Sequence, residues 1–201
     1  MACEARLTKI LMAQYKNFIS DPHPNLLAIM DNNNIRIWYF LICGLGEPFL
    51  SGEYIFKLTA PIDFPQSPPK FEFCTANGVF IPGGSICISV GEFHTNDHPG
   101  KSGSYGWRSA LGMKGFAIQV VNGLICNECL ESGIGIKILP DLLKIELAKS
   151  SHRNNLENYA ELVQQFETII AESPNIEPVK NIIKARNNNE MDKLIDSLLN
   201  Y

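Results

Sequence analysis

The 201-residue sequence lacks any apolar run long enough to cross a lipid bilayer. Its longest apolar stretches, 37–43 and 116–126, are short and contain polar breaks. Residues 1–6 show no apolar core behind a basic start, so no secretory leader is indicated. Residues 152–201 carry helical patterning and no membrane-spanning stretch. We therefore expect a cytoplasmic protein with no transmembrane segment.

The sequence also lacks an excess of positive charge. It has 17 Lys and Arg against 21 Asp and Glu, which gives a formal net charge of −4. Domains that bind nucleic acids are usually basic, so we expect no nucleic-acid partner. The hydrophobic share of 45% is that of an ordinary globular protein.

A second pair of closely spaced cysteines is missing as well. The six cysteines are scattered, and without a secretory leader reduced thiols are expected in preference to disulfides. Cys126 and Cys129 have the spacing of metal ligands, but a structural zinc site needs two more ligands. We expect no metal site and no cofactor.

Hydrophobic periodicity predicts an α+β fold, because one helix precedes a group of strands and further helices follow it. The first helix is expected at 2–19. An antiparallel meander of four strands is expected at 26–30, 35–43, 52–59 and 70–75. The prolines of segment 63–69 exclude a central strand there. Further helices are expected at 108–125, 139–149, 156–171, 178–186 and 191–199, the last two separated by the asparagine triplet 187–189.

Cys87 follows a loop rich in glycine and proline, where neither a regular strand nor a helix is expected. A loop cysteine taken alone is usually a small hydrophobe. The alternative is a nucleophile presented at the surface. A long polar loop with several glycines, 91–106, comes next and contains His94 and His98.

Four motifs in order resemble those of the ubiquitin-conjugating enzymes. They are Trp-Tyr-Phe-Leu-Ile-Cys-Gly at 38–44, Phe-Leu-Ser-Gly-Glu-Tyr at 49–54, Asp-Phe-Pro-Gln-Ser-Pro-Pro-Lys at 63–70, and Gly-Ser-Ile-Cys-Ile at 84–88. The resemblance covers about residues 5–151, which implies a catalytic core at 1–151 and a helical extension at 152–201. The sequence Thr75-Ala76-Asn77-Gly78, with Asn77 ten positions before Cys87, is similar to the endoplasmic-reticulum branch of that family, whose members usually carry a membrane tail.

The resemblance implies that Cys87 accepts ubiquitin, or a ubiquitin-like protein, as a thioester and passes it to a lysine or to a Ser/Thr hydroxyl. Asn77 matches the family asparagine, whose amide stabilises the oxyanion or orders the active loop. His94 is either a general base for a hydroxyl acceptor or a loop histidine in water, and His98 competes for the same role.

The resemblance also implies two partner-binding surfaces. Arg6 and Lys9 fall on the helix face that the family turns toward the ubiquitin-activating enzyme. The ligase-facing loops of the family match Phe64, Gln66, Trp107, Ser109 and Ala110. Gln66 replaces a position that is often a large apolar residue, and Ser109 one that is often proline, so ordinary ligase recognition is in question.

Two other functions fit parts of the sequence. A catalytically silent variant would bind ubiquitin or a ligase only, but such variants usually lack the cysteine. A cysteine hydrolase built on Cys87 and His94 would leave the four motifs unexplained, and no third orienting residue is evident.

Overall fold

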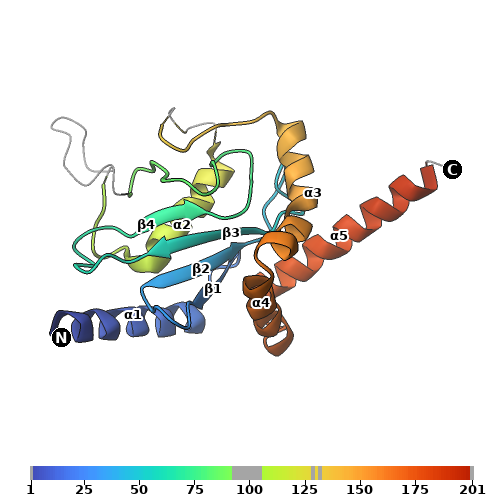
Figure 1. The fold of residues 1–201 in the computed structure, drawn as a ribbon. Helices are drawn as coiled ribbons and strands as arrows, with labels where there is room; N and C mark the ends of the chain where they lie inside the picture. The colour runs from blue at the N-terminus through green and yellow to red at the C-terminus, as the bar shows by residue number, and fades with distance from the viewer. Residues whose placement is uncertain (1, 92–105, 128–129, 131–132, 200–201) are drawn as a thin grey trace.

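A four-stranded antiparallel sheet forms the centre of the computed structural model, which describes residues 2–91, 106–127, 130 and 133–199 (Figure 1). The strands are β1 (Leu26–Met30), β2 (Ile37–Ile42), β3 (Tyr54–Thr59) and β4 (Lys70–Phe73), in the order β1-β2-β3-β4. The predicted meander is confirmed. The prolines of segment 63–69 lie between β3 and β4, where no ladder hydrogen bond is lost.

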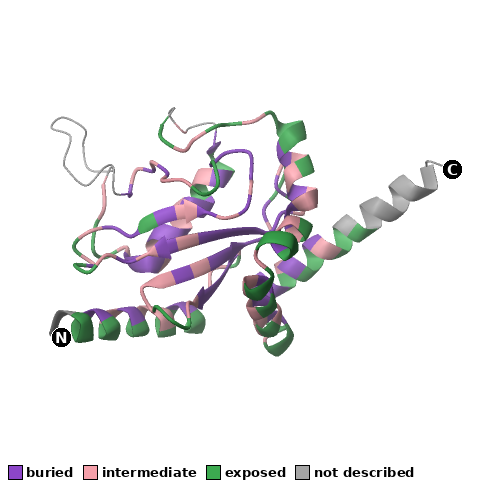
Figure 2. Ribbon diagram, in the orientation of Figure 1, coloured by how far each residue is buried: buried purple, intermediate pink, exposed green. Residues whose placement is uncertain are grey.

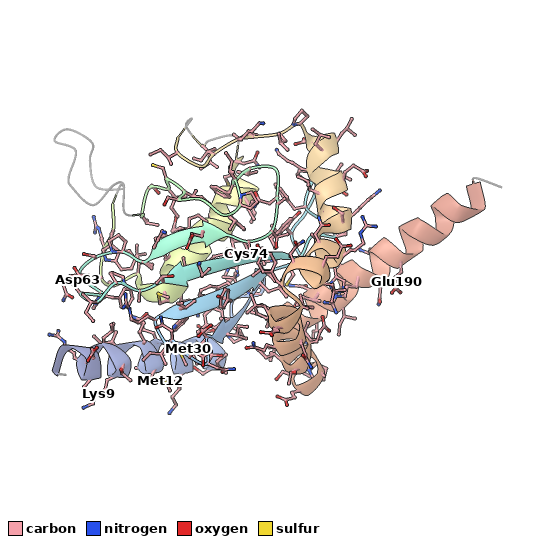
Figure 3. The ribbon with its side chains drawn as sticks, viewed as in Figure 1. Lys9, Met12, Met30, Asp63, Cys74 and Glu190 are labelled. Carbon is pink, nitrogen blue, oxygen red and sulfur yellow. The ribbon has the colours of Figure 1, made fainter. Side chains whose placement is uncertain are left out.

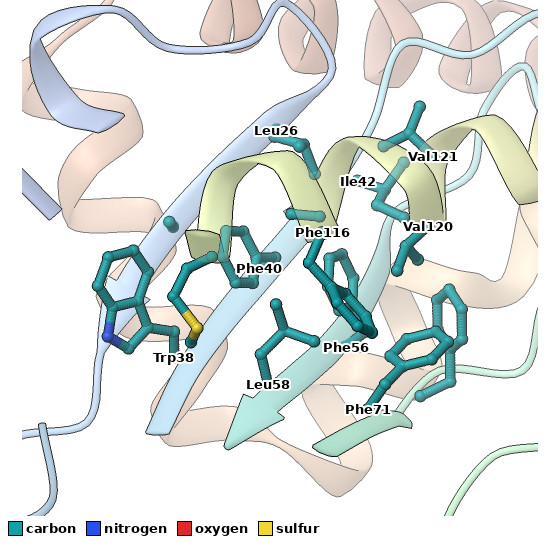
Figure 4. Packing of buried hydrophobic residues seen from close by; sticks show 14 of the residues in the cluster. Leu26, Trp38, Phe40, Ile42, Phe56, Leu58, Phe71, Phe116, Val120 and Val121 are labelled. Atoms are coloured by element: carbon teal, nitrogen blue, oxygen red, sulfur yellow. The ribbon is translucent and has the colours of Figure 1, made fainter. Parts of the chain in front are cut away.

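One face of the sheet packs against α1 (Ala2–Ser20) and α2 (Gly112–Ile125). The even-numbered residues of β1, β2 and β3 point to this face, and so do Phe71 and Phe73 of β4. The rings of Phe40 and Phe56 stack there with centroids 4.9 Å apart. Phe116 and Val120 of α2 complete the cluster, as Figure 4 shows. Alternate side chains of a strand point to opposite faces, so the odd-numbered residues of β1, β2 and β3 point to the other face of the sheet.

That second layer comes from the C-terminal helices α4 (Ala160–Glu172) and α5 (Glu177–Leu199). A second cluster of buried residues joins them to the opposite face of the sheet; its members are Leu27, Ile29, Leu41, Cys43 and Ile55 from the sheet region, and Val163, Phe166, Ile170, Val179 and Ile182 from the helices. Beneath this layer β1 and the C-terminal half of β2 are buried on both faces, whereas burial alternates at the start of β2 and along β4 (Figure 2).

Two predicted helix boundaries are wrong in the C-terminal region. The structure has one helix, α3 (Asp141–Asn158), across residues 150–155, where a break was expected. Its polar residues Ser151 and Asn155 point inward and form hydrogen bonds, so they suit a buried helix face. The break falls instead at Tyr159, whose backbone is not helical (φ −140°, ψ 40°).

The predicted separation of two last helices is also wrong, because α5 runs without a break through the asparagine triplet 187–189. Asparagine disfavours a helix by less than about 1 kcal/mol per residue relative to alanine, and after Pro178 in its first turn α5 contains neither glycine nor proline. The predicted helix at 108–125 begins later, at Gly112, whose φ of +58° is left-handed. The side chain of Gln14 lies where a Cβ of residue 112 would be and accepts the Met113 N–H.

Candidate active site

The segment after β4 turns sharply at Asn77, which is fully buried. Its Oδ1 accepts the backbone N–H groups of Val79 (3.0 Å) and Phe80 (2.8 Å). Its Nδ2 donates to the carbonyl oxygen of Thr75 at 3.1 Å. One carboxamide thus fixes the backbone on both sides of itself, as asparagine often does in turns.

Gly78 provides the conformation that this turn requires. Its φ of +78° is left-handed, and a Cβ there would lie 2.8 Å from Cγ of Lys144. Lys144 is buried, and its Nζ donates to Oδ1 of Asn127 (2.9 Å) and Oδ1 of Asp141 (3.0 Å). The turn is therefore packed against the start of α3.

Segment 134–139 lies alongside the loop and braces it. The N–H of Ile81 donates to the Gly135 carbonyl, and the N–H of Lys137 donates to the Val79 carbonyl, each at 2.8 Å. The N–H of Cys87 donates to the carbonyl of Ile134, also at 2.8 Å. The only sign of this role in the sequence is the alternation of glycine and isoleucine at 133–136, which does not by itself predict a brace for the loop.

The Cys87 side chain is half-buried, between the buried side chains of Ile86 and Ile88. Partial burial raises the pKa of the Cys87 thiol above its ordinary value. Ile81 and Ile134, which are 46% and 58% exposed, flank this part of the loop. A thiol in an apolar, accessible setting can receive an acyl group on a chain that lies against these isoleucines.

The other described cysteines occupy different settings. Cys43 is buried beneath α5, and burial strongly raises the pKa of its thiol. Burial raises the pKa of the Cys74 thiol to about 11. Cys126 is exposed at the end of α2, away from any loop of this kind. The geometry therefore favours Cys87 as the reactive cysteine, with Cys126 as the natural control.

Comparison with known proteins places this site in a family. The family model described as "Ubiquitin-conjugating enzyme" matches residues 10–134, a stretch that includes the sheet, Asn77 and Cys87. The chain belongs to the ubiquitin-conjugating enzyme family. The family resemblance expected from the motifs and the α+β fold expected from the order of helices and strands are thereby confirmed.

The curated relatives include two yeast proteins named "Ubiquitin-conjugating enzyme E2 6". The one from Kluyveromyces lactis is 31% identical over 157 residues, which is 77% of this chain and 56% of the relative. The one from Debaryomyces hansenii is 29% identical over 172 residues, 85% of this chain and 64% of the relative. The chain thus spans less than two thirds of the length of these relatives. A solved structure of human ubiquitin-conjugating enzyme E2 G1 aligns with a TM-score of 0.47 and 25% identity, covering 57% of this chain and 91% of that chain.

The residues expected to contact the partners of this ubiquitin-conjugating enzyme include exposed and buried side chains. Arg6 and Lys9 are exposed on α1. Figure 3 shows Lys9 at the same end of the molecule as Asp63 of the proline-rich segment, and far from Glu190 of α5. Both cations can therefore reach a partner that approaches this end.

Trp107 joins the two segments expected to face a ligase. Its indole N–H donates to the carbonyl of Pro65 at 2.8 Å, and its ring lies 5.9 Å from that of Phe64. Phe64 is buried, so it supports the surface from beneath. Of the five residues expected to face a ligase, the exposed ones are Gln66, Ser109 and Ala110.

His94, His98 and Cys129 lie outside the described residues. Within the described part of the chain, no group of three or more His, Cys, Asp or Glu residues is placed to hold a metal ion. The described helices likewise include none that is both long and apolar enough to traverse a membrane.

Proposed function

We propose that this chain carries ubiquitin, or a ubiquitin-like protein, as a thioester on Cys87 and transfers it to an acceptor. The observation that carries the proposal is the setting of Cys87: a half-buried thiol on a braced loop, within the stretch that matches the family. Membership of the family supports ubiquitin transfer as the reaction, and the position of Cys87 on the loop supports its thiol as the group that carries ubiquitin.

Charging is an exchange of thioesters. The Cys87 thiolate attacks the C-terminal carbonyl carbon of ubiquitin held on the activating enzyme, a C–S bond forms, and the thiolate of that enzyme leaves. In the second step an acceptor amine or hydroxyl attacks the same carbon, loses its proton, and expels the Cys87 thiolate. The raised pKa of Cys87 lowers the fraction of thiolate at neutral pH, so positioning must provide much of the rate.

Asn77 supports the second step by ordering the loop. Its carboxamide is buried and forms hydrogen bonds with the backbone of residues 75, 79 and 80. This favours the loop-ordering role over oxyanion stabilisation, the other role that the sequence left open.

Arg6 and Lys9 are proposed to contact the activating enzyme. Gln66, Ser109 and Ala110 are proposed to meet a ligase, with Phe64 and Trp107 beneath them. The cytoplasmic location stays a prediction from the sequence.

His94 is proposed as the general base when the acceptor is a hydroxyl. The His94→Gln variant should then discharge more slowly to serine or threonine, while charging and discharge to lysine stay unchanged. Equal loss in all three reactions, or in none, would remove His94 from the mechanism. Single-turnover discharge to free amino acids measures each reaction.

The proposal is tested by incubating the protein with ubiquitin-activating enzyme, ATP and ubiquitin, and then separating the products on a non-reducing gel. The expected result is an adduct that thiols cleave, formed by the wild type and by Cys126→Ser. The Cys87→Ser variant should give no thiol-sensitive adduct. Absence of any adduct would leave a silent ubiquitin-binding variant, and release of ubiquitin from a preformed conjugate would indicate a hydrolase.

A further inference from the structure

A buried hydrogen-bonded chain connects α3 to the turn at Asn77. It starts at Asn155, whose side-chain carboxamide is 2% exposed. The Nδ2 of Asn155 donates to the backbone carbonyl of Glu53 at 2.8 Å, and its Oδ1 accepts the hydroxyl of Thr75 at 2.5 Å. Both ends of this carboxamide are bonded, so its orientation is fixed.

Thr75 stands where the pairing of β3 with β4 has ended. The register ends at Phe56 with Phe73, and the N–H groups of Cys74 and Thr75 both donate to the Ile55 carbonyl. The Ile55 N–H therefore needs another acceptor, and the Thr75 hydroxyl oxygen accepts it at 2.9 Å. The side chain of Thr75, held by Asn155, thus replaces a rung of the sheet ladder.

From Thr75 the connection continues to the cysteine. The Thr75 carbonyl accepts the Asn77 amide, and Asn77 holds the N–H groups of Val79 and Phe80. Segment 78–81 then pairs with 135–139, and the Cys87 N–H bonds to Ile134 at the end of the same brace. A displacement of Thr75 would therefore move Asn77 and loosen the loop that carries Cys87.

We infer that Thr75 and Asn155 form a positioning pair for the transfer step, an inference that rests on the proposed function. Both side chains are buried, so neither touches ubiquitin or the acceptor; they act through Asn77. Asn155 belongs to the stretch 152–201 that the sequence assigns to a separate helical extension. The C-terminal region thus contributes a side chain that orders the active loop.

The Thr75→Val variant removes the hydroxyl and keeps the shape of the side chain. It should slow single-turnover discharge of a preformed ubiquitin thioester to lysine about tenfold, through kcat with the KM for lysine unchanged, because a small misplacement of the reacting groups is costly. Charging, which needs the accessible thiol, should stay within about twofold. The Thr75→Ser variant keeps the hydroxyl and should restore discharge to nearly the wild-type rate.

Two further variants separate positioning from general destabilisation. Asn155→Leu should slow discharge as Thr75→Val does, and the double variant should be no slower than the slower single, because both remove one connection. Val163→Ala weakens the packing of α4 on the sheet, and Val163 takes no part in the hydrogen bonds that connect Asn155 to the loop of Cys87. This variant should therefore discharge at the wild-type rate below its melting temperature. A rate loss in Val163→Ala as large as in Thr75→Val, or additive effects of the pair, would overturn the inference.

Amide hydrogen exchange gives a readout that needs no ubiquitin. Exchange of the Val79 and Phe80 amides should be about tenfold faster in Thr75→Val than in the wild type and restored in Thr75→Ser, because the Asn77 oxygen that protects them is no longer held. Failure of the wild type to form a thioester would overturn the proposed function and this inference together. A wild type that charges, with a Thr75→Val variant that discharges equally fast, would overturn this inference alone.

Discussion

At the scale of single residues, Cys87 is set apart from Cys43 and Cys74 by access. Burial raises the pKa of all three thiols, and it does so most for Cys43, which lies beneath α5. Only a thiolate attacks a carbonyl carbon at a useful rate. The Cys87 sulfur is therefore accessible, and its raised pKa keeps it mostly in the thiol form at neutral pH.

Alkylation of Cys87 by iodoacetamide should accelerate about tenfold per pH unit between pH 7 and pH 8, because the thiolate fraction rises tenfold per unit below the pKa. The raised pKa means that no plateau is reached by pH 8.5. The measurement is the alkylation rate at Cys87, resolved by mass spectrometry of its peptide. A rate that is already flat from pH 7 would show a lowered pKa and contradict the stated effect of burial.

The motifs predicted Cys87 and Asn77 because their spacing and their neighbours are local in sequence. Asn155 and Lys144 could not be predicted in this way. Each acts on the loop across a long sequence separation, and a polar residue in a helix usually indicates the solvent face. Only the packed structure shows that both are buried against the turn.

At the scale of elements, Arg186 connects α5 to α4 and to the segment before β3 through ion pairs. It forms two hydrogen bonds with the buried carboxylate of Glu53, at 2.6 and 2.8 Å, and two more with Glu167 of α4. Burial would raise the pKa of Glu53, but hydrogen bonds from Arg186 and His152 outweigh it and hold that pKa below its ordinary value. These charged side chains thus connect the residue before β3 with α3, α4 and α5.

Replacing Arg186 by methionine should lower the free energy of unfolding by about 3 kcal/mol, because the Glu53 carboxylate would stay buried without its main partner. Urea denaturation followed by circular dichroism measures the change. The matched control is Arg153→Met, which breaks an exposed pair with Glu157 at 3.9 Å and should cost about 0.5 kcal/mol or less. Similar losses in the two variants would contradict the role assigned to Arg186.

The helix boundaries show the limit of periodicity at this scale. The strands and the first helix were predicted correctly because their apolar patterns are strong. The course of α3 was missed because Ser151 and Asn155 are polar, which suggests a break in a hydrophobicity pattern. Both form buried hydrogen bonds with the backbone of Glu53, and Asn155 also bonds to Thr75. The continuity of α5 was missed because asparagine was given the weight of a helix breaker.

At the scale of the whole molecule, the two faces of one sheet carry two cores. In β1, β2 and β3 the even-numbered residues pack under α1 and α2, and odd-numbered residues such as Leu27 and Ile55 belong to the cluster under α4 and α5. The strands couple the two cores through their shared backbone. The division into a core at 1–151 and an extension at 152–201 stays a prediction, and the structure shows extensive packing between these two stretches.

Phe166→Ala should test this coupling, because Phe166 is 1% exposed in the second core. The substitution should cost about 3–5 kcal/mol of unfolding free energy. Trp38 and Trp107 pack in or against the first core. The unfolding midpoint followed by tryptophan fluorescence should therefore move to a lower urea concentration by the same amount as the midpoint followed by helical circular dichroism. Loss of helix signal ahead of the fluorescence change would show that α4 and α5 unfold separately.

The central claim is that Cys87 carries the acyl group, and the most direct measurement is intact-protein mass spectrometry after reaction with activating enzyme, ATP and ubiquitin. The account predicts that wild-type protein gains the mass of one ubiquitin less one water and loses it on addition of a thiol. Cys87→Ser should gain the same mass as an oxygen ester that resists thiol, is cleaved by hydroxide, and maps to residue 87. An adduct on Cys126, or an unmodified wild type, would contradict the account.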